Sequence, residues 1–531
     1  MNIDASSLPD NTSELKEVIF NLVNAYSAFE DKERSYQQKI EYLEERIRLL
    51  QNEIFGRKTE KRFFPEPPSV QMGLFSDPEA VLPEIVPEDE ITIPEHTRKK
   101  RGRKPLPDDL PRIEVVHELT EEQRLCECGC VKGKIGEETS EKLDIIPAKI
   151  QVIRHIRCKY ACKNCEGVES QGPTVVIAPP PAEIIPKGIA TAGLLAHVLS
   201  AKFEDALPFY RQEKIFDRMG IDLPRATMCG WAIKVGEACE PLMDLLAGMI
   251  RSGPMQIDET TVQVLKEPGR ANTTKSYMWV FRGGTREHPV LLFQYHPTRT
   301  GQVPLDFLKG YKGYVQTDAY IGYDGLLKLP GIVLLGCWAH ARRNFVKVIE
   351  ARPNPKKSGL AEEALTLIRK LYEIEEYARE GEFKPEQIYQ LRQEISKPIL
   401  NDIKIWLDHT ADRTPPQGLL GKAVHYALKN WDRLNRYIED GQLNIDNNLI
   451  ENAIRPFALG RKNWLFAGHP NGAKASGIIF SLIETAKANG LKPYFYLRYL
   501  FEHLPLAQTE ADYKKLLPQS VDPALIATLP A

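Results

Sequence analysis

Residues 255–265, MQIDETTVQVL, begin the stretch that decides the fold of this 531-residue chain. Further short runs of apolar residues follow it, namely SYMWVFRG (276–283), PVLLFQY (289–295), GYVQTDAY (313–320), the helix-like GYDGLLKL (322–329) and IVLLGC (332–337). Apolar and β-branched runs of this length predict strands. Three strands in succession, a fourth ending in an acid, and then helix alternating with strand predict a mixed sheet flanked by helices.

Two acidic residues stand inside this otherwise core-like sequence. Asp258 lies in the first predicted strand, and Asp318 lies at the end of the fourth, just past the apolar Tyr314 and Val315. Nothing about stability requires a carboxylate at these positions, because burying one is unfavourable. Since carboxylates on neighbouring strands can converge on one side of a sheet, we expect these two to belong to a site.

A third acid, Glu451, lies in NIDNNLIENAIRPFALGRKNWLF, which begins at Asn444 and has a helical pattern with Asp446 as its cap. Amide and basic side chains surround it at helical spacing, as expected for a site that grips a phosphate: Asn447, Arg455, Arg461 and Lys462. The plainer interpretation is an exposed pair of Glu451 and Arg455 on one helix, worth only about 0.3 to 0.5 kcal/mol.

Three carboxylates from distant parts of the chain suit a pair of divalent cations. Two such ions, about 3.5 to 4 Å apart, can activate the attacking oxygen and stabilise the leaving oxygen during displacement at a phosphodiester. Hard oxygen ligands favour Mg²⁺ or Mn²⁺. The resulting hypothesis makes Asp258, Asp318 and Glu451 both the catalytic residues and the metal ligands, with Arg455, Arg461 and Lys462 binding DNA.

Three other residues near these acids invite a functional interpretation. His340 and Arg342, in CWAHARRNF, follow a strand that looks buried and can reach a phosphate held by the acids. An isolated histidine is more often structural. Trp464 is suited to stacking on a base, although packing in an aromatic core is the commoner role.

The N-terminal residues 1–60 carry apolar side chains at alternating spacings of four and three, which predicts a coiled coil and therefore a homo-oligomer. Glu33 alone interrupts this seam, which reads Leu15, Ile19, Leu22, Tyr26, Phe29, Glu33, Tyr36, Ile40, Leu43, Ile47, Leu50, Ile54. A lone amphipathic helix packed on its own protein is the alternative, because aromatic residues are poor zipper residues.

Residues 61–112 are predicted to be a linker with a basic end. Its acidic, proline-rich part has no Lys or Arg from Phe64 to His96 and gives way to RKKRGRKP. An extended Arg-Gly-Arg can enter a narrow minor groove, so Arg101, Arg103 and Lys104 form an AT-hook-like candidate for DNA binding. A solvated loop that neutralises the acidic linker explains the same run.

Six of the nine cysteines lie in residues 113–172, which we predict to be a zinc-binding domain. Four of them suit a tetrahedral Zn²⁺ site, with Cys130 able to replace either of the first two: Cys126, Cys128, Cys162 and Cys165. The second pair has C-x-x-C spacing, but the first pair does not. Reduced structural cysteines are the alternative.

The remaining sequence is predicted to form three more parts. Residues 173–250 are helical, with Gly220 and Pro224 allowing a helix-turn-helix that would place Arg225 to Lys234 in a major groove, although generic helical packing explains them equally. Residues 251–480 would hold the sheet and a charged helical insertion at about 348–440, and residues 481–531 would form a C-terminal region.

The net charge of −2 does not indicate which partners the protein binds. No apolar run is long enough for a membrane span and no leader is visible, which predicts a cytoplasmic protein.

Several segments together resemble the signature blocks of the insertion-sequence-66 family of transposases, over nearly the whole chain. They are LLQNEIFGRKTEK, QIDETTVQV, YVQTDAYIGYDGL, GCWAHARRNF and IDNNLIENAIRPFALGRKNWLFAG. The resemblance implies a ribonuclease-H-like domain with DDE chemistry at Asp258, Asp318 and Glu451. It also implies zinc binding between Cys126 and Cys165. The first cysteine pair departs from the family's usual C-x-x-C, and the Tyr, Arg and Lys signature around the last acid of some other DDE groups is absent.

The expected fold is thus a multidomain α/β protein, in which a coiled coil, a zinc-binding domain and a helical DNA-binding region precede a ribonuclease-H-like catalytic domain with a helical insertion. The expected function is that of a transposase whose partners are its element ends, target DNA and accessory proteins of the same element. Two alternatives stay open, a ribonuclease-H-like nuclease without strand transfer and an inactive DNA-binding regulator derived from a transposase.

Overall fold

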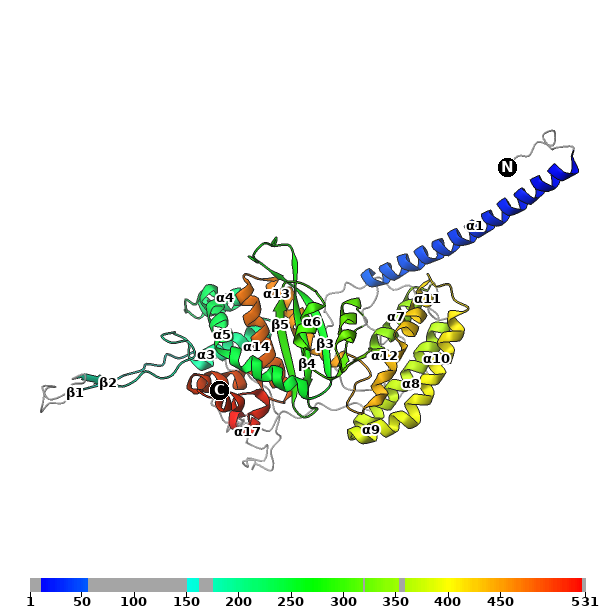
Figure 1. Cartoon of the computed structure of the whole chain (residues 1–531). Helices are drawn as coiled ribbons and strands as arrows, with labels where there is room; N and C mark the ends of the chain where they lie inside the picture. Colours follow the sequence, from blue (N-terminus) through cyan, green and yellow to red (C-terminus); the bar gives the residue numbers. More distant parts are fainter. Residues whose placement is uncertain (1–10, 56–149, 162–174, 319, 353–358, 528–531) are drawn as a thin grey trace, which may run out of the picture. The chain divides into compact units, whose positions relative to one another are not determined.

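The computed structural model describes residues 11–55, 150–161, 175–318, 320–352 and 359–527 (Figure 1). The chain divides into two compact units, one of Met1–Glu66 with Pro181–Ala531 and the other of Pro67–Pro180. Each unit is described by itself.

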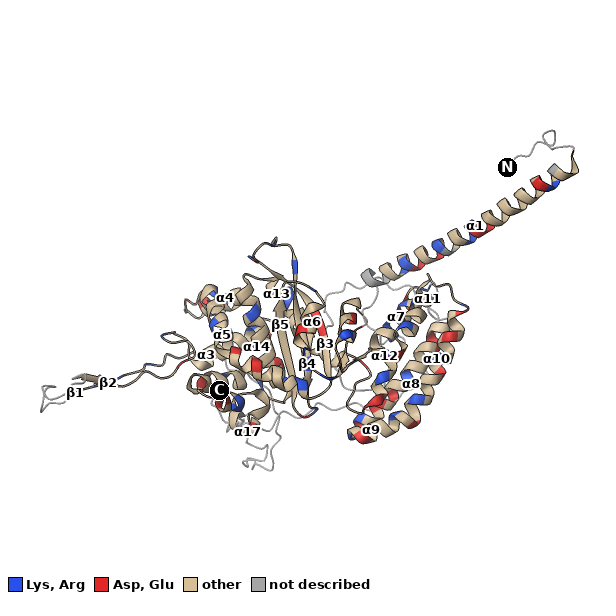
Figure 2. Cartoon of the chain, viewed as in Figure 1, with Lys and Arg blue, Asp and Glu red and all other residues tan. Residues whose placement is uncertain are grey.

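A six-stranded mixed sheet organises the larger unit, in the order β5-β4-β3-β6-β7, with β8 pairing to β3. The β3, β4 and β5 strands are antiparallel, whereas β6, β7 and β8 join by parallel pairing. The strands are β3 Met255–Val264, β4 Lys275–Gly284, β5 Pro289–His296, β6 Gly313–Gln316, β7 Ile332–Leu335 and β8 Phe466–Ala467. The first five fall where the sequence predicted strands, and they carry few charged residues (Figure 2). The mixed sheet flanked by helices is therefore confirmed.

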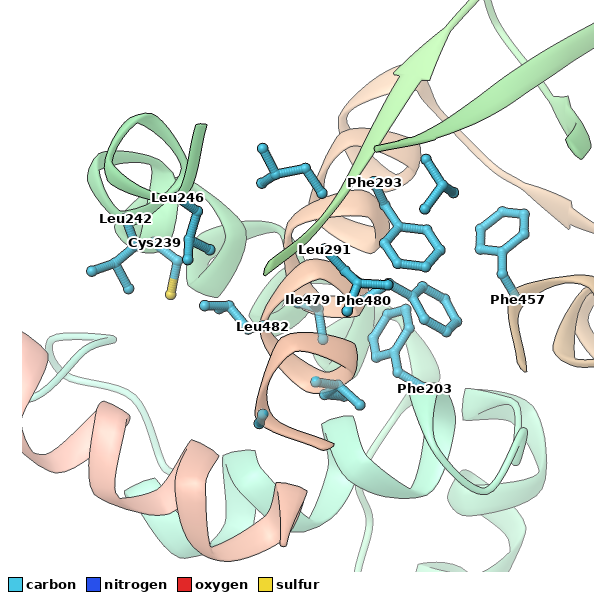
Figure 3. Packing of buried hydrophobic residues seen from close by; sticks show 14 of the residues in the cluster. Phe203, Cys239, Leu242, Leu246, Leu291, Phe293, Phe457, Ile479, Phe480 and Leu482 are labelled. Atoms are coloured by element: carbon cyan, nitrogen blue, oxygen red, sulfur yellow. The ribbon is translucent and has the colours of Figure 1, made fainter. Parts of the chain in front are cut away.

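Helices from both ends of the unit bury the antiparallel strands in one core (Figure 3). Phe203, Phe293, Phe457 and Phe480 meet at its centre, with Phe480 5.2 Å from both Phe203 and Phe457, measured between ring centroids. The α14 helix lies close against β5. A Cβ added to its Gly477 would stand 2.6 Å from the Phe293 carbonyl oxygen of β5. The helices of this core are α3 Ala192–Phe203, α4 Phe209–Arg218, α5 Arg225–Met249, α13 Asn448–Trp464, α14 Pro470–Ala488 and α15 Pro493–His503.

The predicted domain boundaries at residues 250 and 480 both fall within this one core. Buried residues from Ile185 to Ile250 pack in the same cluster as the sheet. The α14 helix runs unbroken across the second boundary. Neither boundary separates two cores. Short elements complete this part: η3 Ile250–Ser252, α6 Gln302–Phe307, η4 Ile321–Lys328, η7 Leu504–Leu506, α16 Glu510–Lys515, η8 Pro518–Ser520 and α17 Pro523–Ala527.

The predicted helix-turn-helix has the expected elements, but much of its second helix is buried. The α4 helix ends at Arg218 and α5 begins at Arg225. Met228 and Trp231 of α5 belong to the core, whereas Arg225 and Lys234 are exposed. Core packing thus accounts for part of the helix, and its placement in a DNA groove stays a prediction.

A second cluster of buried residues lies in the helices between β7 and α13, which we call the helical insertion. Both basic and acidic residues lie along its helices (Figure 2). Its elements are α7 Trp338–Glu350, α8 Leu360–Glu380, α9 Pro385–Leu391, the π-helical turn η5 Arg392–Ser396, α10 Lys397–Ala411, α11 Leu419–Lys429, α12 Trp431–Asn435 and η6 Arg436–Glu439. The helical character predicted for residues 348–440 agrees with these bounds.

The N-terminal helix α1, Thr12–Phe55, ends immediately before Gly56, where the apolar seam stops. Most of the seam is exposed, including Tyr36, Ile40, Leu43, Ile47 and Leu50. The C-terminal end of the helix contacts the insertion, where the Arg48 Nε donates to the Ala351 carbonyl oxygen at 2.7 Å. Within the described part of the chain, these exposed seam residues are left uncovered, and their pairing with another chain stays a prediction.

In the smaller unit, the described residues form a two-stranded antiparallel hairpin, β1 Lys159–Ala161 and β2 Val175–Ile177. Cys158, next to β1, is exposed and has a free thiol. The predicted zinc ligands Cys126, Cys128, Cys162 and Cys165 lie outside the described residues, as does the basic run with Arg101, Arg103 and Lys104. No helix in the part of the chain that the structure describes is long and apolar enough to span a membrane.

Candidate active site

The register of two parallel strands brings the first two acids together. The β3 and β6 strands pair Met255 with Val315 and Gln256 with Gln316. Asp258 and Asp318 therefore each lie two residues beyond the last pair, on neighbouring strands that point the same way. Because side chains alternate along a strand, Asp258 shares a face with Gln256. The two acids thus lie on adjacent interior strands of the sheet, the arrangement in which their carboxylates can converge on one side.

Both carboxylates are held by short-range backbone contacts. The Asp258 Oδ1 accepts the backbone N–H of Glu259 at 2.8 Å. The Asp318 Oδ1 accepts the backbone N–H of Tyr320 at 3.1 Å. The second carboxylate oxygen of each acid takes part in neither of these backbone hydrogen bonds. That oxygen is available to an external ligand.

A pair of buried glutamines brings the third acid to the same face. The Gln256 Nε2 donates to the Gln316 Oε1 at 2.7 Å and to the Asp446 carbonyl oxygen at 3.2 Å. The Gln316 Nε2 donates to the carbonyl oxygens of Asn444 at 2.8 Å and Gly336 at 3.0 Å. The sheet thereby holds the segment that leads directly into α13.

Glu451 lies in the first turn of α13, whose Ile450, Ile454 and Phe457 are buried in the core. Asp446 stands one residue before the N-cap, Asn447, and its Oδ1 accepts the backbone N–H of Asn448 at 3.0 Å. The sequence predicted Asp446 as the cap itself, so the true cap is one residue later.

The ion pairs of Glu451 come from α7 rather than from its own helix. The His340 Nε2 is 3.7 Å from one carboxylate oxygen, and the Arg343 Nη2 is 3.6 Å from the other. Arg455, the predicted partner four residues along α13, is exposed. The plainer interpretation of Glu451 as one half of a surface helix pair is therefore wrong.

The other two acids contribute to the electrostatic environment of Asp258. The pKa of Asp258 is raised to about 7, first by removal from water and then by the negative charges of Glu259, Asp318 and Glu451, while the bond from the Glu259 N–H acts to lower it. Burial lowers the pKa of His340, which favours its neutral form, and the Arg343 charge acts in the same direction. An unusually basic carboxyl group beside two other acids is the electrostatic mark of a functional site.

The chemistry of these donors fits a hard divalent cation. Carboxylates that repel one another gain most from a nearby positive charge, and Mg²⁺ keeps several waters and so needs few protein ligands. Among the described residues, no group of three or more His, Cys, Asp or Glu side chains is arranged so that it could hold a metal ion by itself. Water and a bound phosphate would have to supply the remaining ligands.

Three residues that the sequence did not single out extend the site. Glu259, only 2% exposed, accepts hydrogen bonds from the Arg299 Nε and from the Tyr323 hydroxyl. The Arg299 guanidinium also lies over the Tyr320 ring, 3.7 Å from its centroid. The one available signal was a second acid directly after Asp258 in a strand, because the partners of that acid come from distant segments.

The basic residues predicted to bind DNA occupy different environments. Arg455 and Lys462 are exposed on α13. The Arg461 Nη1 instead donates to both Thr260 Oγ1, at 3.2 Å, and Thr261 Oγ1, at 2.7 Å, which ties the end of α13 to β3. Arg461 is therefore already engaged within the protein, and the DNA contacts of all three stay predictions.

Two side predictions can be compared with the same geometry. On α7, the Arg343 guanidinium lies beside Glu451, and the phosphate contact predicted for His340 and Arg342 stays a prediction. Trp464 packs in the aromatic core, 6.1 Å from Phe480 and 6.2 Å from Phe457 between ring centroids. Core packing, the commoner role, thus accounts for the tryptophan.

The fold and the site together define a class: multidomain proteins with acidic residues on adjacent strands of a mixed sheet and a long helical insertion before the last acid. The model of the transposase IS66 family matches residues 187–475, and the chain belongs to this family. Three further matches extend along the chain, to the transposase C of IS166 homeodomain over residues 42–115, the zinc-finger binding domain of transposase IS66 over 123–166, and the IS66 C-terminal element over 481–519.

Curated relatives come from Sinorhizobium fredii (strain NBRC 101917 / NGR234). Uncharacterized protein y4jD is 34% identical over 76% of this chain and 79% of its own length. Uncharacterized protein y4qI is 29% identical over 99% of this chain and 100% of its own length. Uncharacterized protein y4hP is 30% identical over 86% of this chain and 84% of its own length. No solved structure matches the chain.

Proposed function

We propose that this transposase-family protein binds the ends of its insertion sequence and catalyses metal-dependent cleavage and transfer of DNA strands. The observation that supports this most is the register of β3 and β6, which sets Asp258 beside Asp318 on the face where α13 presents Glu451. The raised pKa of Asp258 supports the same grouping. Family membership supplies the transposase class.

We also propose that the sheet and its helices are ribonuclease-H-like. Three antiparallel strands followed by two parallel strands, in the order β5-β4-β3-β6-β7, support this assignment. The acids stand on the central strand, on the adjacent parallel strand and on a later helix, which is how a DDE site divides its ligands between elements.

In this proposal Asp258, Asp318 and Glu451 hold two Mg²⁺ or Mn²⁺ ions, which when bound polarise the attacking and leaving oxygens of the phosphodiester. The chain's own contribution is to orient those ligands and to place positive charge beside the phosphate. Arg343 and neutral His340 face Glu451 from α7 and are suited to donate hydrogen bonds to phosphate oxygens. Arg455, Arg461 and Lys462 are proposed to contact the DNA backbone.

The reaction takes place in two displacements. A water oxygen first bonds to phosphorus as the bond to the 3′-oxygen breaks, which frees a 3′-hydroxyl at the element end. That hydroxyl oxygen then bonds to a phosphorus of the target strand, and the target's own 3′-oxygen leaves with a proton. Each step makes one phosphorus–oxygen bond and breaks one, so no covalent enzyme intermediate is required.

The remaining parts are proposed to bind and assemble. A structural Zn²⁺ held by Cys126, Cys128, Cys162 and Cys165, the AT-hook-like run with Arg101, Arg103 and Lys104, and the α4–α5 region would recognise element ends. The α1 seam would join copies into a homo-oligomer, and accessory proteins of the same element would complete the assembly.

The test uses labelled element ends, target DNA and Mg²⁺. Asp258→Asn, Asp318→Asn and Glu451→Gln are each expected to lower cleavage by at least about 1000-fold, because one lost ligand disrupts transition-state stabilisation worth several kcal/mol. Binding to the ends, measured by gel shift, should persist. Asp306→Asn, an exposed acid on α6, is the matched control.

The products also separate the rival functions. Joined products carrying the donor 3′-end indicate transposition, whereas cleavage without joining indicates a nuclease. End binding without cleavage by the wild-type protein would indicate a DNA-binding regulator. Unchanged cleavage by any of the three variants would refute the role of that residue.

A further inference from the structure

The segment of residues 440–447 joins the helical insertion to α13 and has little regular structure of its own. Its backbone oxygens are nevertheless held from two sides. The sheet holds Asn444 and Asp446 through the two glutamines described above. The insertion holds the same segment from the other side, through Arg392 and Tyr372.

Arg392 begins the π-helical turn η5 and is only 2% exposed. Its Nε and Nη2 donate to the two carboxylate oxygens of Glu375 on α8, at 2.9 and 2.7 Å. Its Nη1 donates to the carbonyl oxygens of Tyr437, at 2.7 Å, and Asp440, at 2.8 Å, and its Nη2 also donates to that of Leu443, at 2.8 Å. A guanidinium has five N–H donors, and these contacts use all five.

Tyr372 makes the second contact from the same helix. It lies three residues before Glu375, and therefore on the same face of α8. Its hydroxyl donates to the Asp446 Oδ2 at 2.9 Å. Burial, together with the Asp446 charge, raises the pKa of this tyrosine well above its ordinary value, so the hydroxyl keeps its proton and remains a donor.

The held segment reaches Glu451 directly. Asp446 accepts hydrogen bonds from Asn448 through both the backbone N–H and the side-chain amide. Asn447, the N-cap, accepts the backbone N–H of Glu451 at 3.1 Å. A shift of Asp446 therefore moves the first turn of α13, on which Glu451 stands.

We propose that the helical insertion positions Glu451, with Arg392 and Tyr372 acting as positioning residues through segment 440–447. The inference rests on the proposed catalytic role of Glu451. A buried ion pair is a poor device for stability alone, since apolar residues of similar volume often stabilise a core as well or better. Five directed donors that converge on three carbonyl oxygens and one carboxylate instead fix a conformation.

Tyr372→Phe is the principal test, because it removes one hydroxyl and leaves the ring in place. Amide hydrogen exchange is measured over peptides covering residues 437–451, alongside single-turnover cleavage of an element-end duplex. We expect faster exchange confined to this segment, and cleavage slowed by about 10- to 100-fold, the scale expected for slight misplacement of a catalytic group. The DNA concentration for half-maximal rate should not change. Tyr377→Phe, with an exposed ring on the same helix, is the matched control.

Arg392→Lys is the second variant. Lysine keeps the charge but offers three donors from one nitrogen, so it cannot reproduce the planar fork. The same local exchange pattern, with a stronger loss of cleavage, is expected. If this substitution prevents folding, Tyr372→Phe decides the matter alone.

Wild-type exchange over 437–451 in Tyr372→Phe would overturn the proposal, and so would faster exchange spread evenly over the insertion. Unchanged cleavage despite local opening would also overturn it. If the wild-type protein does not cleave DNA at all, the proposed function fails, but the exchange experiment still shows whether the insertion holds the segment before α13.

Discussion

At the scale of single residues, Asp258 stands where a carboxylate opposes folding. It lies opposite Val280 in the β3–β4 ladder and next to the fully buried Ile257. Its pKa of about 7 means that the folded protein binds the proton far more tightly than an unfolded chain does. A carboxyl group that is unfavourable to folding in this way marks Asp258 as a candidate for ligand binding.

This imbalance predicts a pH dependence of stability in protein free of magnesium and manganese. A carboxyl group whose folded pKa is raised stabilises the fold at low pH, and the stabilisation is lost as pH rises from about 4 to about 7. Asp258→Asn does not ionise, so it should escape this loss and unfold later than the wild type near pH 8. The shift sets an upper limit of about 4 kcal/mol on the difference.

Fluorescence of the buried Trp279 and Trp338 during denaturation would follow the transition in the sheet and the insertion. The protein is dialysed against zinc-containing buffer, so that any structural zinc remains. Asp306→Asn should keep the wild-type pH dependence. A variant at position 258 with the same pH dependence as the wild type would contradict the prediction.

Glu259 and Arg343 show what a linear sequence hides at this scale. Glu259 draws in Arg299 and Tyr323 from segments far along the chain. The Arg343 guanidinium reaches Glu451 because of the phase of α7, which the sequence alone does not show. The contacts of Glu259 and of Glu451 cannot be predicted from the pattern of neighbouring residues in the sequence.

At the scale of elements, α1 is a helix whose seam has no partner within the described part of its chain. Eight seam residues are large, apolar and exposed: Ile19, Tyr26, Phe29, Tyr36, Ile40, Leu43, Ile47 and Leu50. Continuous exposed apolar surface of this kind marks an interaction site. Heptad spacing favours a second copy of the same helix as the partner.

The double variant Ile40→Lys with Leu43→Lys is therefore expected to convert the oligomer to a monomer. Each side chain is about half exposed in the single chain, so the substitution should leave the fold intact while placing charge inside the helix pair. Light scattering after size exclusion measures the mass. Glu41→Lys, exposed and off the seam, should not change it. A wild-type protein that is already monomeric would remove the role assigned to the seam.

The strands illustrate what could be predicted for elements. Alternating and continuous apolar runs identified β3 to β7, because burial of a strand requires them. The two-residue β8 was not predicted, since Phe466 and Ala467 follow α13 with no strand pattern of their own. Its pairing with β3 depends on where α13 ends.

At the scale of the whole molecule, the site depends on segments that lie far apart in the chain. Gln256 and Gln316 link the sheet to the residues before α13, and Arg392 links the insertion to them. The insertion thus completes the support of the last acid. The insertion therefore has a structural role in the proposed site as well as its own core.

The zinc-binding region provides a test at the same scale. Cys162→Ser or Cys165→Ser is expected to release one zinc per chain and weaken binding to element ends by at least about tenfold, because loss of a ligand unfolds a structural site. Metal analysis and gel shift measure the two effects. Cys229→Ser, an exposed cysteine on α5, should retain zinc. Full zinc content in either variant would contradict the assignment.

The sequence by itself determined the family and the kinds of elements, and it predicted the three acids, because these depend on local pattern and on residue types that carry chemistry. Tertiary structure alone decided which cations face Glu451, that Arg461 is engaged with β3, and how segment 440–447 is held. Those contacts join residues that are between 45 and 200 positions apart. They depend on strand register, helix phase and close packing, which arise only when the chain has folded.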